Sequence, residues 1–444
     1  MGGKTIITNA RVVDGLGNAP FDAHVTLSGN LIAGIDEAMP DTQGARVIDA
    51  AGATVMPGLI DSHCHISFDE VNSNDELFFH RREGLAAIIA AANARKVLRA
   101  GVTSIMDADS LYEIGVDLRD AIEAGVVPGP RMSVGGNALF TSVGDTAGRL
   151  VPDNGRIGYG QVLTSRDEIV REVRRQIKIG VDWIKVHVTG LIPRQRSRGE
   201  LQVWNYEELR LVVETAHELG IPVVGHCRGA SSIRDAARAG FDLILHATYM
   251  DDEALDAVIE HQVAIVPTFT FQANLLEHGP AIGASEELRE IFRREIEESA
   301  EMLKRAYAAG VPLLCGTESG FSLTPYGEWH YREMQVFVEA LGFTPLQAIR
   351  AATSENARAL KMHGELGAIA EGQIADVLVV DGAVDEDVTL LGDPARIRHI
   401  FLGGSEINLP PPEPRRDPPG WRVSHYGDAI LTQQVARRGR DGDD

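Results

Sequence analysis

The sequence has little cysteine, few aromatic residues and no long apolar run. Its three cysteines, Cys64, Cys227 and Cys315, are sparse and odd in number, which indicates reduced thiols and argues against a disulfide framework. No run of about 18 apolar residues predicts a membrane-spanning helix. The opening segment, MGGKTIITNARVVDG, has no basic stretch leading into an apolar one and shows no signal-peptide pattern. We therefore expect a cytoplasmic protein.

Positive charge is also scarce. The chain has 42 Lys and Arg residues against 64 Asp and Glu residues, a net charge of −22, and no basic stripe. This balance argues against nucleic acid or an anionic membrane as a partner. With 44% hydrophobic and 24% charged residues, the composition is typical of a globular protein with a large core. We expect a small-molecule substrate and a homo-oligomer.

The two ends of the chain have the pattern of short β-strands. In residues 1–57, segments such as TIITNARVVDG and AHVTLSG alternate apolar and polar residues between Gly, Asn and Asp turns. The same pattern returns in residues 363–408, in ADVLVVDG and IRHIFLGG. Such strands need partners, so we expect the two ends to pair in one small sheet domain. Residues 409–444 begin with LPPPEPRRDPPGW and predict a Pro-rich extended tail.

The middle of the chain, residues 58–362, has a different pattern. Eight short apolar runs, from VMPGLIDSH to VPLLCGT, are separated mostly by helical patterns such as NYEELRLVVETAHELG. Apolar runs without polar alternation predict strands of a parallel sheet that is buried on both faces. The fold class is therefore α/β, and eight strands match the count of a (β/α)8 TIM barrel. Residues 136–166 and 268–311 are long connections and candidate lids.

Polar residues fall where the apolar runs end. In a parallel barrel these ends open on one face, so residues that are distant in sequence converge there. Imidazole nitrogens and carboxylate oxygens are ligands that Zn²⁺ prefers. A lone histidine at a strand end is more often a turn or packing residue, but the set as a whole favours a metal site. Its members are His63, His65, Lys185, His226, His246 and Glu318.

Two members of this set carry further information. Strand alternation points His63 and His65 to one side and Cys64 to the other, although this pair alone fits a metal site and an exposed turn equally. Lys185, in DWIKVHV, is unusual because a buried lysine is rarely unpaired. His187 shares its face and is either a group that supports the site or a loop histidine.

Six segments within residues 5–405 are informative together: PGLIDSHCH, IKVHVTG, GHC, LILHA, LLCGTESG and GAIAEGQIADVLVVDG. In this order they resemble the metal-dependent amidohydrolase superfamily. The resemblance implies a TIM barrel with a small β-sandwich domain made from both chain ends. It implies that His63 and His65 bind one Zn²⁺ ion and that His226 and His246 bind another, with carboxylated Lys185 as the bridge. Co²⁺ or Mn²⁺ are alternatives. The pattern is most similar to prolidase-like dipeptidases, ochratoxin-type amidases, and phenylurea and thiocarbamate (molinate) hydrolases.

The sequence departs from the superfamily pattern in two places. Glu318 stands in GTESG where the eighth strand usually ends in aspartate, so either one or two metal ions fit the sequence. The segment ALFTSVGDTAG stands where dipeptidase-like members carry a Gly-Gly-His-Gly turn, with Asp145 near that position. The absence of this histidine weakens a dipeptidase interpretation.

The predicted function is metal-dependent hydrolysis of an amide-type C–N bond in an amide, urea or (thio)carbamate that bears an aryl or alkyl group. Glu318 and His246 are the candidate catalytic residues, and Glu318 would move the proton of the attacking water. A dipeptidase or carboxypeptidase is the alternative; the intact ligand set argues against an inactive scaffold, and Lys185 against a deaminase. The candidate substrate-binding residues are His187, Arg194, Trp204, Phe271 and His330, for which a solvated basic loop or loop packing is the competing explanation.

Overall fold

The computed structural model describes residues 3–71, 82–143, 158–191 and 201–411. The chain separates into two units, Met1–Leu409 and Pro410–Asp444. The helices and strands of the described residues belong to the first unit, and nearly all of the second unit lies outside the described residues. Within the described part of the chain, no helix is long and apolar enough to cross a membrane.

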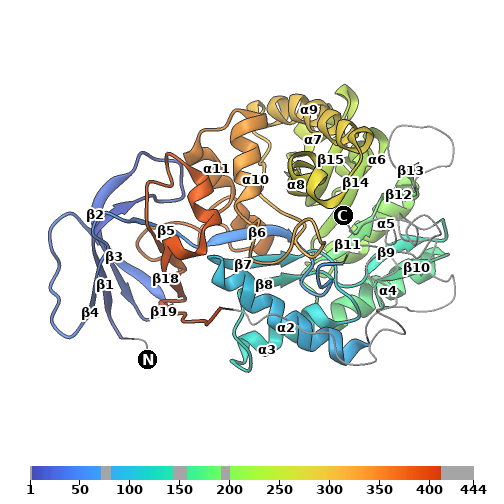
Figure 1. Ribbon diagram of the computed structural model, residues 1–444. Coiled ribbons are helices and arrows are strands. Elements are labelled where there is room, and N and C mark those ends of the chain that lie inside the picture. The colour runs from blue at the N-terminus through green and yellow to red at the C-terminus, as the bar shows by residue number, and fades with distance from the viewer. Residues whose placement is uncertain (1–2, 72–81, 144–157, 192–200, 412–444) are drawn as a thin grey trace, which may run out of the picture. The chain divides into compact units, whose positions relative to one another are not determined.

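Strands from the two chain ends pair in one eight-stranded sheet, whose order is β19-β18-β17-β5-β1-β2-β3, with β4 beside β1. The ends are joined where β5 and β17 run antiparallel, with Val55 opposite Val379. Figure 1 shows these blue and orange-red strands side by side. The strands are β1 (Thr5–Val12), β2 (Phe21–Ser28), β3 (Leu31–Asp36), β4 (Arg46–Asp49), β5 (Thr54–Pro57), β17 (Val377–Val380), β18 (Ile397–Leu402) and β19 (Ser405–Glu406).

The sheet is stabilised by a core of its own. Ile7, Val55, Val377 and Phe401 are buried in one apolar cluster that includes residues from both ends of the chain. Removing this apolar surface from water stabilises the pairing by roughly 25 cal/mol per Å². The division of this domain into two packed layers, as in a β-sandwich, stays a prediction.

The middle of the chain forms parallel strands in a three-stranded sheet, β6-β7-β8, and a six-stranded sheet, β10-β9-β11-β14-β15-β16. Single parallel bridges, such as Gly135 with Trp183 and Cys64 with Ser319, connect neighbouring segments, and the closed barrel stays a prediction. The strands, with the separate pair β12 and β13, are β6 (Leu59–Cys64), β7 (Val102–Asp107), β8 (Arg131–Val134), β9 (Ala138–Thr141), β10 (Gly160–Leu163), β11 (Ile184–His187), β12 (Thr189–Leu191), β13 (Leu201–Gln202), β14 (Val223–Gly229), β15 (Leu243–Tyr249) and β16 (Ala264–Val266).

Helices alternate with these strands, and α6, for example, packs on β14 and β15. Their ends follow local rules: Asn205 and Glu208 form a capping box at the start of α5, and Gly180 ends α4 in the left-handed conformation. The helices are α2 (Glu83–Arg99), α3 (Ile114–Glu123), α4 (Arg166–Ile179), α5 (Tyr206–His217), α6 (Ala230–Ala239), α7 (Asp252–His261), α8 (Thr270–His278), α9 (Glu286–Ala308), α10 (Arg332–Val336) and α11 (Pro345–Ala351). Shorter helical segments are η1 (Gly279–Ile282), η2 (Phe337–Leu341), η3 (Asn356–Leu360), η4 (Val388–Gly392) and η5 (Pro394–Arg396).

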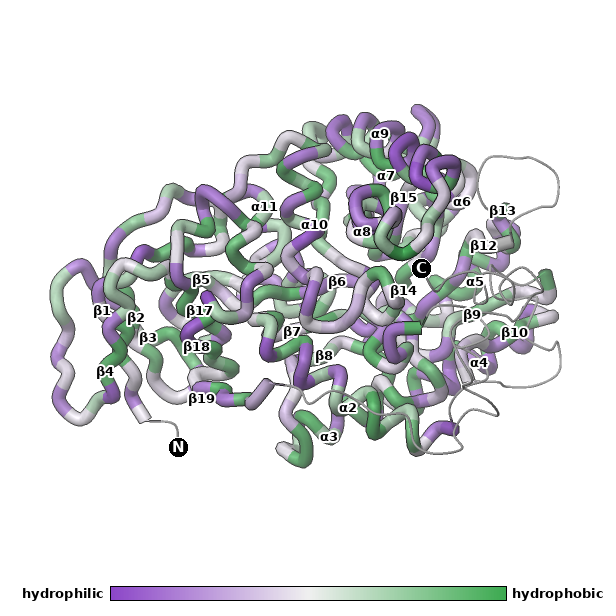
Figure 2. Tube along the Cα trace, viewed as in Figure 1, coloured by the Kyte–Doolittle hydropathy of each residue, from purple (hydrophilic) through white to green (hydrophobic). Residues whose placement is uncertain are grey.

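The two segments predicted as lids have different secondary structure. Residues 268–311 form α8, η1 and α9, and α9 contacts α8 and β15. Figure 2 shows α9 as largely hydrophilic, in agreement with its many charged residues. Residues 136–166 include β9 and β10, but their central part, 144–157 with Asp145, lies outside the described residues. A lid function for either segment stays a prediction.

Candidate metal centre

The carboxyl ends of the parallel strands bring the predicted histidines together. The strand register places His187 beside His226 and Cys227 beside His246. The ring centroids of His226 and His246 are 4.4 Å apart, and those of His63 and His246 are 5.3 Å apart. Residues separated by more than 180 positions in sequence therefore lie within one cluster, as the parallel-sheet pattern predicts.

His63, His246 and Glu318 form the most compact group. One ligand atom from each lies within 4.8 Å of the others, and His246 Nε2 is 3.9 Å from Glu318 Oε1. The Nε2 atoms of His63 and His246 are buried and have no hydrogen-bond partner among the described residues. Since a buried polar atom is costly to leave unpaired, these atoms fit the ligands of a divalent metal ion.

The chemistry of the two imidazoles supports this fit. His63 Nδ1 lies 2.9 Å from Thr268 Oγ1, which leaves Nε2 as the coordinating atom. Burial lowers the pKa of His63 well below the ordinary value, and the neighbouring charges of His65 and Lys185 lower it further. Burial and the neighbouring His226 and His63 lower the pKa of His246 in the same way. Both rings are therefore neutral, which is the form that binds a metal ion.

The backbone around Glu318 is held in an unusual conformation. Glu318 has φ +55° and His246 has φ +73°, in the left-handed region that residues other than glycine rarely adopt. The Glu318 amide donates to the carbonyl oxygen of His63 at 2.6 Å, which ties the segment to β6. Burial raises the pKa of the Glu318 carboxyl, although the charges of His65 and Lys185 oppose this. A raised pKa makes the carboxylate a stronger base, which favours acceptance of a proton.

Asp61, from the PGLIDSHCH segment, forms hydrogen bonds to the backbone segments that carry the candidate ligands. Its Oδ1 accepts from the His63 amide at 3.1 Å and the Thr317 amide at 3.0 Å. Its Oδ2 lies 2.8 Å from His330 Nδ1, and His330 Nε2 accepts from the Gly327 amide at 3.1 Å. Asp61 thereby links β6 to the segment that carries Glu318. Both ring nitrogens of His330 thus have partners within the fold, and substrate contact by this residue stays a prediction.

Sequence reasoning missed Asp109. Its side chain is fully buried beyond the end of β7, within hydrogen-bond distance of His65, Lys185 and His187. Burial opposes its ionisation, but the charges of Lys185 and His65 outweigh burial and lower the pKa of Asp109 well below the ordinary value. The signal was present, since GVTSIMDAD is an apolar run that ends in two carboxylates.

The other predicted substrate-binding residues differ in how far they are buried. Arg194 lies outside the described residues. Trp204 is buried, and its indole N–H donates to the carbonyl oxygen of His187 at 2.8 Å. His187 itself is buried and stacks on His226 at 4.9 Å between ring centroids. Phe271 of α8 is half-buried. Trp204 and His187 thus support the wall of the site, and substrate contact by any of these residues stays a prediction.

Three phenylalanine rings form a row that ends at His65. Phe68 stacks on the His65 ring with centroids 4.2 Å apart, and Phe321 lies edge-on to Phe68 at 5.5 Å. Phe271 continues the row at 5.9 Å from Phe321. Of these rings the sequence pointed only to Phe271. Because Phe271 and Phe321 are half-buried, the row offers apolar surface beside the candidate metal ligands.

Glu333 holds the start of α8, which carries Phe271. Its carboxylate accepts from the Phe269 amide at 2.9 Å, the Thr270 amide at 2.8 Å and the Thr270 hydroxyl at 2.6 Å. Burial raises the pKa of Glu333 to about 7, from 4.5, even though these donors lower it. Because the pKa is raised in the folded state, the resulting stabilisation is complete below pH 4.5 and is lost as the pH rises through about 7.

We therefore expect the free energy of unfolding of the wild-type protein, relative to Glu333→Gln, to fall between about pH 5 and about pH 8. The raised pKa sets an upper limit of about 3 kcal/mol on this change. Urea unfolding of both proteins across this range measures it. A constant difference across the range would contradict a raised pKa for Glu333.

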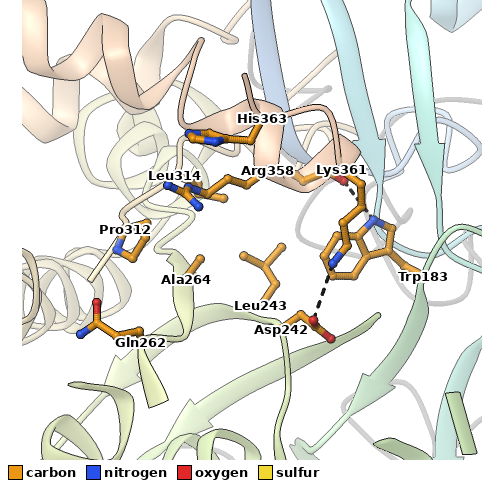
Figure 3. A pocket seen from close by; sticks show the side chains of 11 residues that line it. Trp183, Asp242, Leu243, Gln262, Ala264, Pro312, Leu314, Arg358, Lys361 and His363 are labelled. Atoms are coloured by element: carbon orange, nitrogen blue, oxygen red, sulfur yellow. Dashed lines mark hydrogen bonds and ion pairs between the residues drawn. The ribbon is translucent and has the colours of Figure 1, made fainter. Parts of the chain in front are cut away.

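A separate pocket of about 340 Å³ lies at the opposite ends of the parallel strands. Asp242 and Trp183, which line it, come just before β15 and β11. Figure 3 shows Lys361 reaching across the Trp183 ring, 5.1 Å from its centroid, to within 3.6 Å of Asp242. No predicted site residue lines this pocket. In parallel barrels the chemistry is at the carboxyl ends of the strands, so this pocket is not the candidate active site.

Comparison with known proteins shows the family to which this chain belongs. A family model described as the amidohydrolase family matches residues 54–407, and the chain belongs to this family. It is therefore an enzyme that hydrolyses carbon–nitrogen bonds. The family is generally metal-dependent, in agreement with the group formed by His63, His246 and Glu318. Its members imply a TIM barrel with an additional domain, which agrees with the separate sheets of this chain.

The chain is similar to several individual proteins. The chain is 28% identical to ochratoxinase of Aspergillus niger, over 91% of this chain and 87% of that protein. It is 27% identical to a prolidase solved in complex with N-methylphosphonate-L-proline, with a TM-score of 0.79 over 91% of this chain and 99% of that one. Molinate hydrolase, at 23% identity and a TM-score of 0.76 over 97% and 99% of the two chains, shares the fold.

Proposed function

We propose that this enzyme is a metal-dependent hydrolase that cleaves an amide-type bond, in an amide, urea or (thio)carbamate, of a small molecule bearing an aryl or alkyl group. The observation that carries the proposal is the group of buried His63 and His246 with half-buried Glu318, in which both imidazole Nε2 atoms lack a hydrogen-bond partner among the described residues. A closed (β/α)8 barrel and a β-sandwich from both chain ends are part of the proposal. The parallel bridges and the pairing of β5 with β17 support them.

His63, His246 and Glu318 would hold one Zn²⁺ ion, or Co²⁺ or Mn²⁺ in its place. His65, His226 and carboxylated Lys185 would complete a ligand set for one or two ions, and the division of the ligands between two ions stays a prediction. When bound, such an ion polarises the substrate carbonyl and lowers the pKa of water toward about 7. Lys185 and His63 are buried, so water is largely excluded from this part of the site. The effective dielectric constant is therefore low, and electrostatic effects are strong there.

The residues of the chain carry the proton through the reaction. Glu318 accepts a proton from the attacking water as the new C–O bond forms. It then gives that proton to the leaving nitrogen as the C–N bond breaks, so no net charge is left on the enzyme. His246 Nε2 lies 3.9 Å from Glu318 Oε1, a separation that allows both groups to hold the same ion. Transfer of this kind contributes typically about 10²- to 10⁴-fold to the rate.

The row formed by Phe68, Phe321 and Phe271 supports a substrate with an apolar group, because these rings lie beside His65. The names of the relatives ochratoxinase and molinate hydrolase also support small-molecule substrates. A second candidate function is a dipeptidase or carboxypeptidase, which the 27% identity to a prolidase favours. The segment ALFTSVGDTAG, which lacks histidine, opposes it.

A substrate panel distinguishes the two candidates. Purified enzyme supplied with Zn²⁺, Co²⁺ or Mn²⁺ is assayed against aryl amides, aryl ureas and carbamates, and in parallel against N-acyl amino acids and Xaa-Pro dipeptides. We expect the highest kcat/KM in the first set. Turnover confined to the second set would replace the leading proposal with a dipeptidase or carboxypeptidase. Turnover of neither set would contradict both.

A further inference from the structure

A charged cluster lies at the carboxyl ends of β14 and β15. Arg228 follows His226 near the end of β14, and Tyr249 follows His246 at the end of β15. Glu295 of α9 contacts both strands. Its Oε2 accepts from Arg228 Nη2 at 2.7 Å, and its Oε1 accepts from the Tyr249 hydroxyl at 2.5 Å. The cluster therefore joins α9 to the two strands that carry these candidate metal ligands.

Arg228 lies close enough to the candidate ligands to affect them. Burial and the neighbouring His226 and His63 lower the pKa of His246, and the positive charge of Arg228 lowers it further. The side chain of Arg228 is 19% exposed, whereas that of Glu295 is 9% exposed. Arg228 is therefore a positive charge beside the candidate metal centre, and part of its side chain is open to solvent.

The contact with Glu295 changes what Arg228 can recognise. A guanidinium beside a hydrolytic site ordinarily favours a substrate with a carboxylate, which it binds through charge-assisted hydrogen bonds. Here Glu295 already supplies the carboxylate. A substrate carboxylate would have to displace Glu295, which would leave a largely buried negative charge without its ionic partner and beside a second negative charge. The pair of Arg228 and Glu295 therefore opposes anionic substrates.

We propose that Glu295 is a specificity-determining residue, which neutralises Arg228 and makes the enzyme select substrates that carry no charge near Arg228. Tyr249 is a positioning residue that holds Glu295 through its hydroxyl. This inference rests on the proposed function and deepens it, because it favours neutral amides, ureas and carbamates over N-acyl amino acids. The specificity depends on a residue of α9, which is distant in sequence from both strands.

The test uses derivatives of the best substrate of the panel, in pairs that differ only in a carboxylate or a neutral carboxamide. One pair carries this group on the acyl side of the scissile bond and the other on the side of the leaving nitrogen. The wild-type, metal-supplied enzyme is expected to have the higher kcat/KM for the carboxamides. In Glu295→Gln, the ratio of kcat/KM for carboxylate to carboxamide is expected to rise at least about 10-fold in one pair, because the repulsion is removed and Arg228 can bind the carboxylate.

Two further variants show whether this rise has the proposed cause. Glu297→Gln is the matched control, because Glu297 is an exposed glutamate of the same helix and its loss changes the net charge equally. It is expected to leave the ratio unchanged. The double variant Arg228→Gln with Glu295→Gln is expected to lose the rise seen in Glu295→Gln alone.

Tyr249→Phe keeps the test valid if Glu295→Gln fails to fold. It removes one hydrogen bond from Glu295 and is expected to raise the same ratio by up to about 10-fold. An unchanged ratio in Glu295→Gln or Tyr249→Phe, an equal rise in Glu297→Gln, or a rise that persists in the double variant would overturn the role of Glu295. A wild-type preference for the carboxylates would also overturn it, yet would leave the proposed hydrolase intact. No turnover of any substrate of the panel would contradict the proposed function itself.

Discussion

Replacing Glu318 by glutamine is expected to lower kcat by at least about 10²-fold while the protein keeps its metal. The amide cannot accept the proton of the attacking water or deliver one to the leaving nitrogen. It preserves the size of the side chain and an oxygen atom that faces His246, so the metal site itself survives. Steady-state kinetics on the best substrate of the panel, with metal analysis of the same sample, measure both quantities.

Glu318→Asp is the matched control. It keeps the carboxylate but is shorter by one methylene group. We expect its kcat to lie between those of the wild-type protein and Glu318→Gln. Near-normal turnover by Glu318→Gln would remove Glu318 from the mechanism.

Replacing His246 by alanine is expected to remove most of the bound metal and to lower kcat/KM by at least about 10³-fold. His246 supplies one of the three ligand atoms of the compact group, and its Nε2 has no hydrogen-bond partner among the described residues. The several kcal/mol of transition-state stabilisation that a metal ion contributes would be lost with the ion. Metal content by mass spectrometry and kcat/KM on the same preparation measure the effect.

His261→Ala is the control for this variant. His261 is an exposed histidine at the end of α7, and its loss should change neither metal content nor rate. Full metal content together with normal kcat/KM in His246→Ala would show that the compact group is not the metal site.

The sequence was sufficient to predict that His63, His226 and His246 lie close together, because parallel strands place their carboxyl ends on one side of the sheet. His63, His226 and His246 were recognised from the ends of apolar runs alone. Strand position does not show how ligands divide between ions. The structure brings His63, His246 and Glu318 close together, and the rings of His63 and His65 and of His226 and His246 are also neighbours, so the division of the ligands between ions stays a prediction.

The supporting residues were beyond sequence reasoning for a different reason. Asp61 and His330 are 269 positions apart, and their contact depends on the path of the loop that carries Glu318. Asp109 ends an apolar run like the histidines, but a carboxylate at a strand end has no distinctive partner until the fold brings Lys185 and His65 to it. Residues that orient a site are thus harder to find from sequence than residues that bind at it.

The central claim is that a metal ion held at His63, His246 and Glu318 is required for C–N bond hydrolysis. Its most direct test is to strip the protein with a chelator, then restore Zn²⁺, Co²⁺ or Mn²⁺ and follow turnover against metal bound per chain. We predict loss of activity on stripping and its recovery in proportion to the first ion bound. Fewer than about 0.2 ions per chain in the purified protein, with no activity restored by any of the three metals, would contradict the account.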